Sequence, residues 1–441
     1  MKRGAVLAVT AALLLLSCGR SALVGGEVSP AAGYPSSPTA TVQTDCCSAV
    51  GNEASPAPTV EAGGSVRTGP RKHFPVGVYE DAALLEGDVE RFTAMVEDLR
   101  SRGFHSVLLT NGHMDRDEGL LAAADRLAFD VYYGPHYELA REWWAAEVPA
   151  DRQKAREVIA PLVERLGTHP RLRGYYIVDE PTLDLKDKVA LATDVFRELD
   201  PSRPVMPDLV GLDRAGPIFS AARPDVMLLN VFPFGTNNPV GDFTLSGFGY
   251  ELLSIDSVGY LRLVTQPKPA DMPLWLIAQA HRFKEPGERF ALREPVPAEM
   301  RAQQWLAVGE GATGLFWFVY SSQQGWRGLK DNPDLYDEAS RLVRRLLPLR
   351  ETLLGLRRSE GMFRVAGAGN PYVSTLVGKT DSRYYAVLVN RDCERSRELS
   401  VTSSSKGQLR DLETGQGFAQ TEPITLGPGD GMVLELLNEQ S

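Results

Sequence analysis

The sequence has few cysteines, no excess of positive charge and no long apolar run. Its 441 residues include 4 cysteines, of which Cys46 and Cys47 are adjacent and Cys393 has no obvious partner. A disulfide between neighbouring residues is strained, so we expect a fold that does not depend on disulfides. The formal net charge is −10, which leaves no basic surface of the kind that nucleic acids require.

The sequence also lacks the common signatures of metal, nucleotide and acyl-transfer sites. It contains no His-Glu-x-x-His, no paired Cys-x-x-Cys, no Gly-x-x-x-x-Gly-Lys and no Gly-x-Ser-x-Gly. An alternative, a metal-dependent hydrolase that uses His113, His136 and His281, has no supporting ligand spacing. We therefore expect no metal ion and no cofactor.

The N-terminal apolar run is too short to span a bilayer. Lys2 and Arg3 precede it, and residues 5–16 have the length of a secretory signal core. Leu15-Leu16-Ser17-Cys18 resembles the lipobox of bacterial lipoproteins. The resemblance implies that Cys18 is lipidated and that the protein is exported and membrane-anchored in the bacterial cell envelope. The alternative is a plain secretory signal that contains a cysteine.

The segment after Cys18 has a biased composition. Residues 19–71 are rich in Ser, Pro, Ala, Gly, Thr and Val, and they show no helical or strand period. This composition predicts a disordered tether between the signal, residues 1–18, and a folded body. Residues 72–441 suffice for one barrel and a small additional domain.

Apolar runs that favour strands alternate with helical patterns eight times between residues 72 and 357. The helical patterns repeat apolar residues at three- and four-residue spacings and include residues 120–127 and 250–264. The alternation predicts an α/β fold, a (β/α)8 TIM barrel; the alternative is an open doubly wound sheet. The expected strands are 74–79, 105–110, 130–133, 174–178, 204 to about 208, 225–232, 273–279 and 314–320.

Residues 358–441 change to short apolar runs separated by turns rich in Gly, Pro, Asp and Ser. This pattern predicts a C-terminal antiparallel β-sandwich domain. Its expected strands are 363–366, 372–377, 384–390, 398–401 and 431–436.

The pair Asp179 and Glu180 indicates where the chemistry lies. Residues 174–178 form a buried-strand pattern, and Pro181, which lacks an N–H, must end the strand. Acids at the carboxyl end of a barrel strand occupy the place where such barrels carry their active sites. The alternative is that these two acids cap the next helix.

Polar and aromatic side chains recur at the ends of the expected strands. Carboxylates and amides bind hydroxyl groups, aromatic faces cover the apolar face of a sugar ring, and a protonated acid can donate to a glycosidic oxygen. These residue types predict a carbohydrate substrate. The candidates for binding it are Glu80, His113, His136, Asp208, Gln279 and Trp317.

Three motifs together resemble the large glycosidase clan of (β/α)8 barrels. Residues 175–181, Tyr-Tyr-Ile-Val-Asp-Glu-Pro, look like its acid/base motif, in which a glutamate before proline protonates the leaving group. Residues 232–234, Phe-Pro-Phe, are similar to its Tyr-Pro-Tyr element after strand six, and residues 316–318, Phe-Trp-Phe, to its strand-eight aromatic. The resemblance implies a glycoside hydrolase in which Glu180 is the proton donor and Trp317 binds the sugar.

The sequence departs from that clan at two positions. The residue before the acid is Asp179 instead of asparagine, and the strand-seven nucleophile, a glutamate in the clan, is Gln279. An amide cannot form a glycosyl ester, so the second carboxylate stays open among Asp179, Asp208 and Glu80. The competing interpretation is a non-catalytic glycan-binding lipoprotein that kept the barrel and lost the nucleophile.

Overall fold

The computed structural model describes residues 73–245, 254–284, 288, 291–323 and 325–438. The chain divides into two units, residues 1–68 and residues 69–441. Cys18, the expected signal and the expected tether lie outside the described residues. Among the residues described, no helix has both the length and the apolar character needed to cross a membrane.

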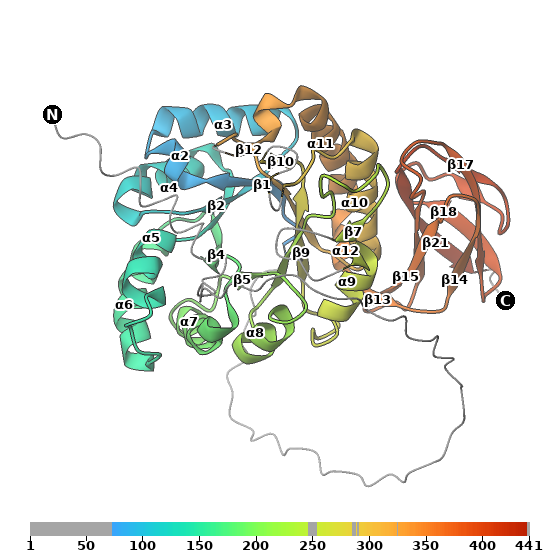
Figure 1. The fold of residues 1–441 in the computed structure, drawn as a ribbon. Coiled ribbons are helices and arrows are strands. Elements are labelled where there is room, and N and C mark those ends of the chain that lie inside the picture. The colour runs from blue at the N-terminus through green and yellow to red at the C-terminus, as the bar shows by residue number, and fades with distance from the viewer. Residues whose placement is uncertain (1–72, 246–253, 285–287, 289–290, 324, 439–441) are drawn as a thin grey trace, which may run out of the picture. The chain divides into compact units, whose positions relative to one another are not determined.

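Eight parallel strands close into a barrel, as the alternating pattern predicted. Around the barrel the order is β1-β11-β9-β6-β5-β4-β3-β2, and each strand pairs in parallel with its two neighbours. Figure 1 shows the strands as an inner ring surrounded by helices. The barrel strands are β1 (Val76–Asp81), β2 (Ser106–Thr110), β3 (Asp130–Tyr133), β4 (Leu172–Val178), β5 (Val205–Leu209), β6 (Met227–Val231), β9 (Leu274–Gln279) and β11 (Gly314–Phe318).

The strands bury both faces, which explains why they are almost continuously apolar. Alternate residues such as Tyr132, Tyr176 and Phe316 fill the barrel interior, and the residues between them pack against the helices. Gly314 makes room for an interior tryptophan, because a Cβ atom there would lie 2.5 Å from Cδ1 of Trp275. The core therefore consists of two layers, one inside the barrel and one outside it.

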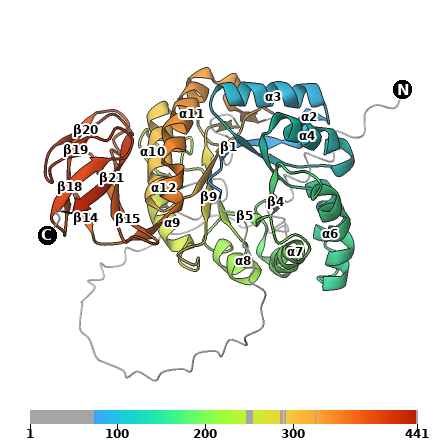
Figure 2. The ribbon, with the colours of Figure 1, turned by 180° about the vertical axis from the view of Figure 1, so that it is seen from behind.

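Helices cover the barrel in the connections between strands, as both views show (Figure 1, Figure 2). Most of them match the periodic patterns, but the helix expected at residues 120–127 begins earlier, at Met114. Asp115 and Asp117 in its first turn stabilise that earlier start through the helix dipole. The helix expected at 250–264 begins at Ser257, and residues 250–253 lie outside the described part. The larger helices are α3 (Val89–Ser101), α4 (Met114–Leu127), α6 (Arg152–Leu166), α7 (Lys186–Leu199), α8 (Ala215–Ala222), α9 (Ser257–Val264), α10 (Pro297–Gly309) and α11 (Pro333–Leu346), and the short ones are α2 (Ala82–Leu85), α5 (His136–Leu139) and α12 (Arg350–Leu354).

Two antiparallel sheets follow the barrel and enclose a core of their own, which agrees with the predicted β-sandwich. The sequence pattern did not predict the strands at 407–411, 417–418 and 424–426. These strands are short, and exposed residues alternate with buried ones within them. One sheet has the order β13 (Leu356–Ser359), β15 (Tyr372–Gly378), β16 (Tyr384–Val389), β21 (Gly431–Asn438), β18 (Gly407–Asp411) and β19 (Gly417–Phe418), and the other has β14 (Phe363–Gly367), β17 (Arg397–Ser403) and β20 (Ile424–Leu426).

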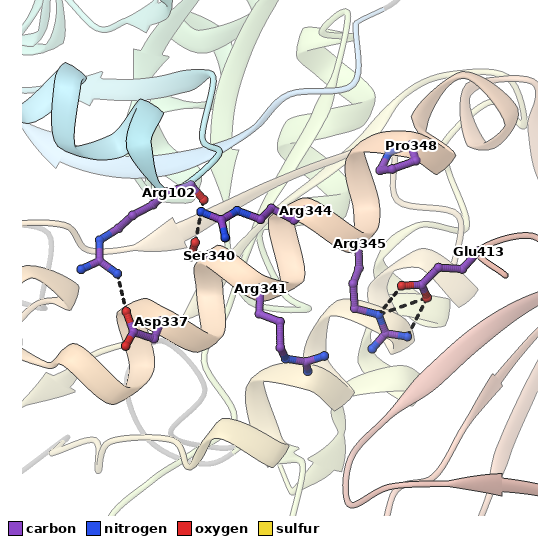
Figure 3. Close-up of a pocket in the computed structure, with 8 residues that line it drawn as sticks. All are labelled: Arg102, Asp337, Ser340, Arg341, Arg344, Arg345, Pro348 and Glu413. Atoms are coloured by element: carbon purple, nitrogen blue, oxygen red, sulfur yellow. Dashed lines mark hydrogen bonds and ion pairs between the residues drawn. The ribbon is translucent and has the colours of Figure 1, made fainter.

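Arg345 connects α11 to the turns that follow β18 and precede β21. The guanidinium of Arg345 donates to Glu413 at 2.8 Å and to Asp430 at 2.6 Å, and it lies 4.9 Å from the ring centroid of Trp305. A surface hollow of about 510 Å³ lies beside this contact. Figure 3 shows that arginine and acidic side chains line it and pair with one another. The hollow is therefore part of a charged junction, away from the carboxyl ends of the barrel strands.

Candidate active site

An irregular turn presents the two adjacent acids at the end of β4. The register with β5 shifts between Tyr176 and Val178, and Glu180 has a φ of 41°. Positive φ is uncommon for a residue other than glycine and is concentrated at functional sites. Asp179 and Glu180 are both partly exposed, although the strand that carries them is buried. Both residues are therefore in part accessible to solvent.

Asn230 on β6 holds the carboxyl group of Glu180. Its Nδ2 donates a hydrogen bond to Oε1 of Glu180 at 2.8 Å, and the asparagine itself is buried. A side-chain amide donor of this kind fixes the direction in which the glutamate points. The sequence alone gave no signal for Asn230, because an asparagine inside an apolar strand also fits a purely structural role.

Asp208, at the carboxyl end of β5, is fully buried beside the two acids of β4. The Tyr176 hydroxyl lies 3.3 Å from its Oδ2, and Oδ1 has no hydrogen-bond partner among the described residues. Burial, together with the negative charges of Asp179 and Glu180, raises the pKa of Asp208 well above its ordinary value. Both effects favour the protonated, neutral form of Asp208.

Two tyrosine hydroxyls hold the carboxylate of Asp179. The hydroxyl of Tyr176 donates to Oδ1 at 2.8 Å, and the hydroxyl of Tyr79 donates to Oδ2 at 3.5 Å. Both tyrosines belong to the barrel interior. Asp179, Glu180 and Asp208 thus form one cluster, and the repulsion within it raises the pKa of Asp208.

His136 contacts the backbone of β4 next to this cluster. Its Nε2 lies 2.9 Å from the carbonyl oxygen of Tyr176, so this nitrogen carries the hydrogen, and Nδ1 accepts from the Thr110 hydroxyl at 3.0 Å. Burial lowers the pKa of His136. The residue is therefore a neutral imidazole that fixes the backbone of β4.

His113 lies outside the cluster, on the loop after β2. Its ring stacks on the exposed ring of Tyr137, with 4.2 Å between centroids, and its Nδ1 lies 3.5 Å from a carboxylate oxygen of Glu138. Within the described part of the chain, His113 makes no hydrogen bond, ion pair or ring contact with Asp179, Glu180 or Asp208, so it belongs to this separate group of side chains.

Glu80 is separated from the cluster by its position on β1. It pairs with Leu109, a residue of the helix-facing layer, and its Oε2 accepts a hydrogen bond from the backbone N–H of Ser321 at 2.9 Å. Burial raises the pKa of Glu80 to about 8. Glu80 is fully buried and anchors the loop after β11, so this geometry does not support direct sugar binding.

Gln279 ends β9 with its side-chain amide engaged by backbone groups. Its Oε1 accepts from the N–H of Phe234 at 2.9 Å, and its Nε2 donates to the carbonyl of Arg293 at 2.9 Å. The side chain is fully buried. Gln279 therefore joins the loop after β6 to the loop after β9, and its amide is not presented to a substrate.

Trp317 faces the helices, contrary to its expected place beneath a sugar. It belongs to the outer layer of the core, whereas its neighbours Phe316 and Phe318 face the barrel interior. Phe318 lies 4.6 Å from the ring of Tyr79 and 5.3 Å from that of Phe232. These three rings form an apolar wall near the acids, and Phe318, not Trp317, is the member of the aromatic triplet that contributes to it.

Comparison with solved structures finds similar folds at low sequence identity. A structure described as a glycoside hydrolase has a TM-score of 0.55 and 12% identity, over 83% of this chain and 92% of that chain. A debranching enzyme from Nostoc punctiforme has a TM-score of 0.48 at 12% identity, over 83% of this chain and 99% of its own. A bacterial fucosidase reaches 0.47 at 12% identity, over 85% and 98%.

No protein-family model matches the chain. No curated protein matches it in sequence either. At 12% identity the likeness concerns the fold alone. The chain has a glycoside hydrolase-like fold, built on a closed barrel of eight parallel strands.

Proposed function

We propose that the protein hydrolyses glycosidic bonds, with Glu180 as the general acid. The observation that carries the proposal is the cluster of Glu180, Asp179 and Asp208 at the carboxyl ends of β4 and β5. Active sites of such barrels lie at this end. The glycoside hydrolase-like fold supports a carbohydrate as the substrate.

The three carboxyl groups differ in what they can do. Glu180 is partly exposed and held by Asn230, so it can approach a glycosidic oxygen in a fixed direction. Asp179 is also partly exposed and is fixed by tyrosine hydroxyls. Asp208 is fully buried and cannot touch a substrate in this conformation. Glu180 and Asp179 are therefore our catalytic residues, and Asp208 is a positioning residue.

Glycan binding without hydrolysis is the second candidate. It is favoured by Gln279, which ends the seventh barrel strand with an amide that backbone groups already occupy. A barrel without a nucleophile on this strand can still bind a sugar.

We also propose that the protein is exported and lipidated at Cys18, and hence that it is a membrane-anchored protein of the cell envelope. The charged start, the apolar run and the lipobox-like motif support this.

The test is hydrolysis of a panel of aryl glycosides by the full chain and by Glu180→Gln. General-acid assistance contributes roughly 10²–10⁴ to a rate, so we expect kcat to fall by at least about a hundredfold. The loss should be smallest with good leaving groups, which need little protonation. The matched control is Asp184→Asn, which changes an exposed acid four residues along the chain and should keep its activity.

Two outcomes would decide against the proposal. Equal losses with good and poor leaving groups would remove the acid role from Glu180. Absence of hydrolysis across the panel, combined with measurable binding of a glycan by calorimetry, would replace the enzyme with the binding protein.

A further inference from the structure

The barrel strands opposite β4 offer no nucleophile. In the order around the barrel, β11 lies opposite β4 and is flanked by β1 and β9. At the described ends of these strands, β11 has Phe318 and β9 has the occupied amide of Gln279. On β1, Glu80 is buried against Ser321, and Asp81 caps helix α2 by accepting from the N–H of Ala83 at 2.8 Å.

The acids near Glu180 cannot replace that nucleophile in the usual way. A retaining or inverting pair of carboxyl groups flanks the scissile bond, separated by about 5–9.5 Å. Asp179 is the residue next to Glu180 on one strand end, and both acids act on the same buried Asp208. Of the three acids in the cluster, the two that are partly exposed, Asp179 and Glu180, therefore come from one strand end, and Asp208 is closed to the substrate.

We propose that the substrate itself supplies the nucleophile: the natural substrate is a 2-acetamido-2-deoxy glycoside whose acetamido oxygen attacks the anomeric carbon while Asp179 orients the amide. This inference rests on the proposed glycoside hydrolysis and names its substrate class. Substrate assistance of this kind is a known exception to the two-carboxylate mechanisms.

The surroundings of Asp179 fit the acetamido group. The Tyr176 and Tyr79 hydroxyls hold its two oxygens, at 2.8 and 3.5 Å, so the carboxylate keeps one orientation. A fixed carboxylate can accept the N–H of the acetamido group. The rings of Tyr79, Phe232 and Phe318 provide apolar surface for its methyl group. Asp208 is buried beside Asp179, and its raised pKa disfavours a second negative charge there.

The reaction balances without any other reagent. The carboxyl proton of Glu180 passes to the glycosidic oxygen as the bond from C1 to the leaving group breaks. The acetamido carbonyl oxygen forms a bond to C1, which gives a five-membered oxazolinium ring whose N–H is held by Asp179. Water then attacks C1, its proton returns to Glu180, and the bond from C1 to the carbonyl oxygen breaks. The product keeps the configuration of the substrate at C1.

The experiment compares matched aryl glycosides that differ only at C2, one with an acetamido group and one with a hydroxyl. We expect turnover of the acetamido sugar at least about a hundredfold faster. Replacing the acetyl group by mono-, di- and trifluoroacetyl weakens the carbonyl oxygen as a nucleophile, so kcat should fall stepwise along the series. Proton NMR of the first product should show retention at C1.

Variants separate Asp179 from general damage. Asp179→Asn should lower kcat on the acetamido substrate by at least about a hundredfold and should weaken a thiazoline analogue of the bicyclic intermediate. Asp184→Asn, the exposed control, should do neither.

Failure of this inference is distinguishable from failure of the proposed function. Fast hydrolysis of the 2-hydroxy sugar, no dependence on fluorination, or inversion at C1 would overturn the acetamido mechanism and leave a glycosidase. No hydrolysis of any glycoside would overturn both.

Discussion

The buried carboxyl group of Glu80 makes a quantitative prediction about stability. Its side chain is fully buried, and its pKa is raised from 4.5 to about 8. The largest cause is loss of solvation, which the Ser321 N–H offsets in part. The folded protein therefore holds a proton on Glu80 across a pH range in which the unfolded chain has already released it.

The sign of the pH dependence follows from this difference in bound protons. Well below a pH of about 4.5 the carboxyl group of Glu80 is protonated in both the folded and the unfolded state, so it makes no pH-dependent contribution to the free energy of unfolding. As the pH rises toward 8, folding must take up a proton, so the free energy of unfolding falls by about 1.4 kcal/mol per pH unit. Over the whole range from 4.5 to about 8 the loss is about 5 kcal/mol, and it stays constant above the folded pKa.

Glu80→Gln should remove this loss. The glutamine can still accept from Ser321, and Oε1 of Glu80 has no partner among the described residues that the substitution would disrupt. Urea unfolding followed by tryptophan fluorescence should show that the variant gains about 3 kcal/mol over the wild type between pH 5.5 and 7.5. Glu97→Gln, at an exposed position of α3, should show no such gain. Parallel stability profiles for wild type and Glu80→Gln would refute the reasoning.

Three further changes test other parts of the molecule. Gln279→Glu should not create a nucleophile; it should cost about 1–3 kcal/mol in urea unfolding, because a backbone carbonyl loses its donor, and a covalent label there from a fluorosugar would contradict this. Cys18→Ala should leave the protein soluble or uncleaved in cell fractionation, and a processed variant that still partitions with membranes would exclude lipidation. Arg345→Ala should destabilise the C-terminal domain by about 2 kcal/mol in calorimetry, since Glu413 and Asp430 lose a shared partner; an unchanged transition would show that the junction is not stabilising.

The sequence was sufficient for the architecture of the barrel. Apolar runs of four to seven residues alternate with helical periods, which indicates parallel strands buried on both faces, and the count of eight favoured a closed barrel over an open doubly wound sheet. The stop at Pro181 also located the turn that carries Asp179 and Glu180. These features depend on local spacing, which a sequence displays directly.

The direction of individual side chains was not readable in the same way. Trp317 and Phe318 are neighbours in an apolar run, and a shift of one residue exchanges the inner and outer faces of a strand. Because both faces are buried, hydrophobicity does not distinguish them. Glu80 was assigned to the sugar for the same reason, although its strand turns it toward the helices.

Only the tertiary structure decided which polar groups are available. Gln279, Asp208 and Glu180 all lie at the carboxyl ends of barrel strands. The amide of Gln279 is hydrogen-bonded to backbone groups of two loops, and Asp208 is fully buried next to the hydroxyl of Tyr176. Those contacts join residues 14 to 45 positions apart in the chain. The sequence thus determined the barrel and the place of its acids, whereas long-range packing determined which acids can reach a substrate.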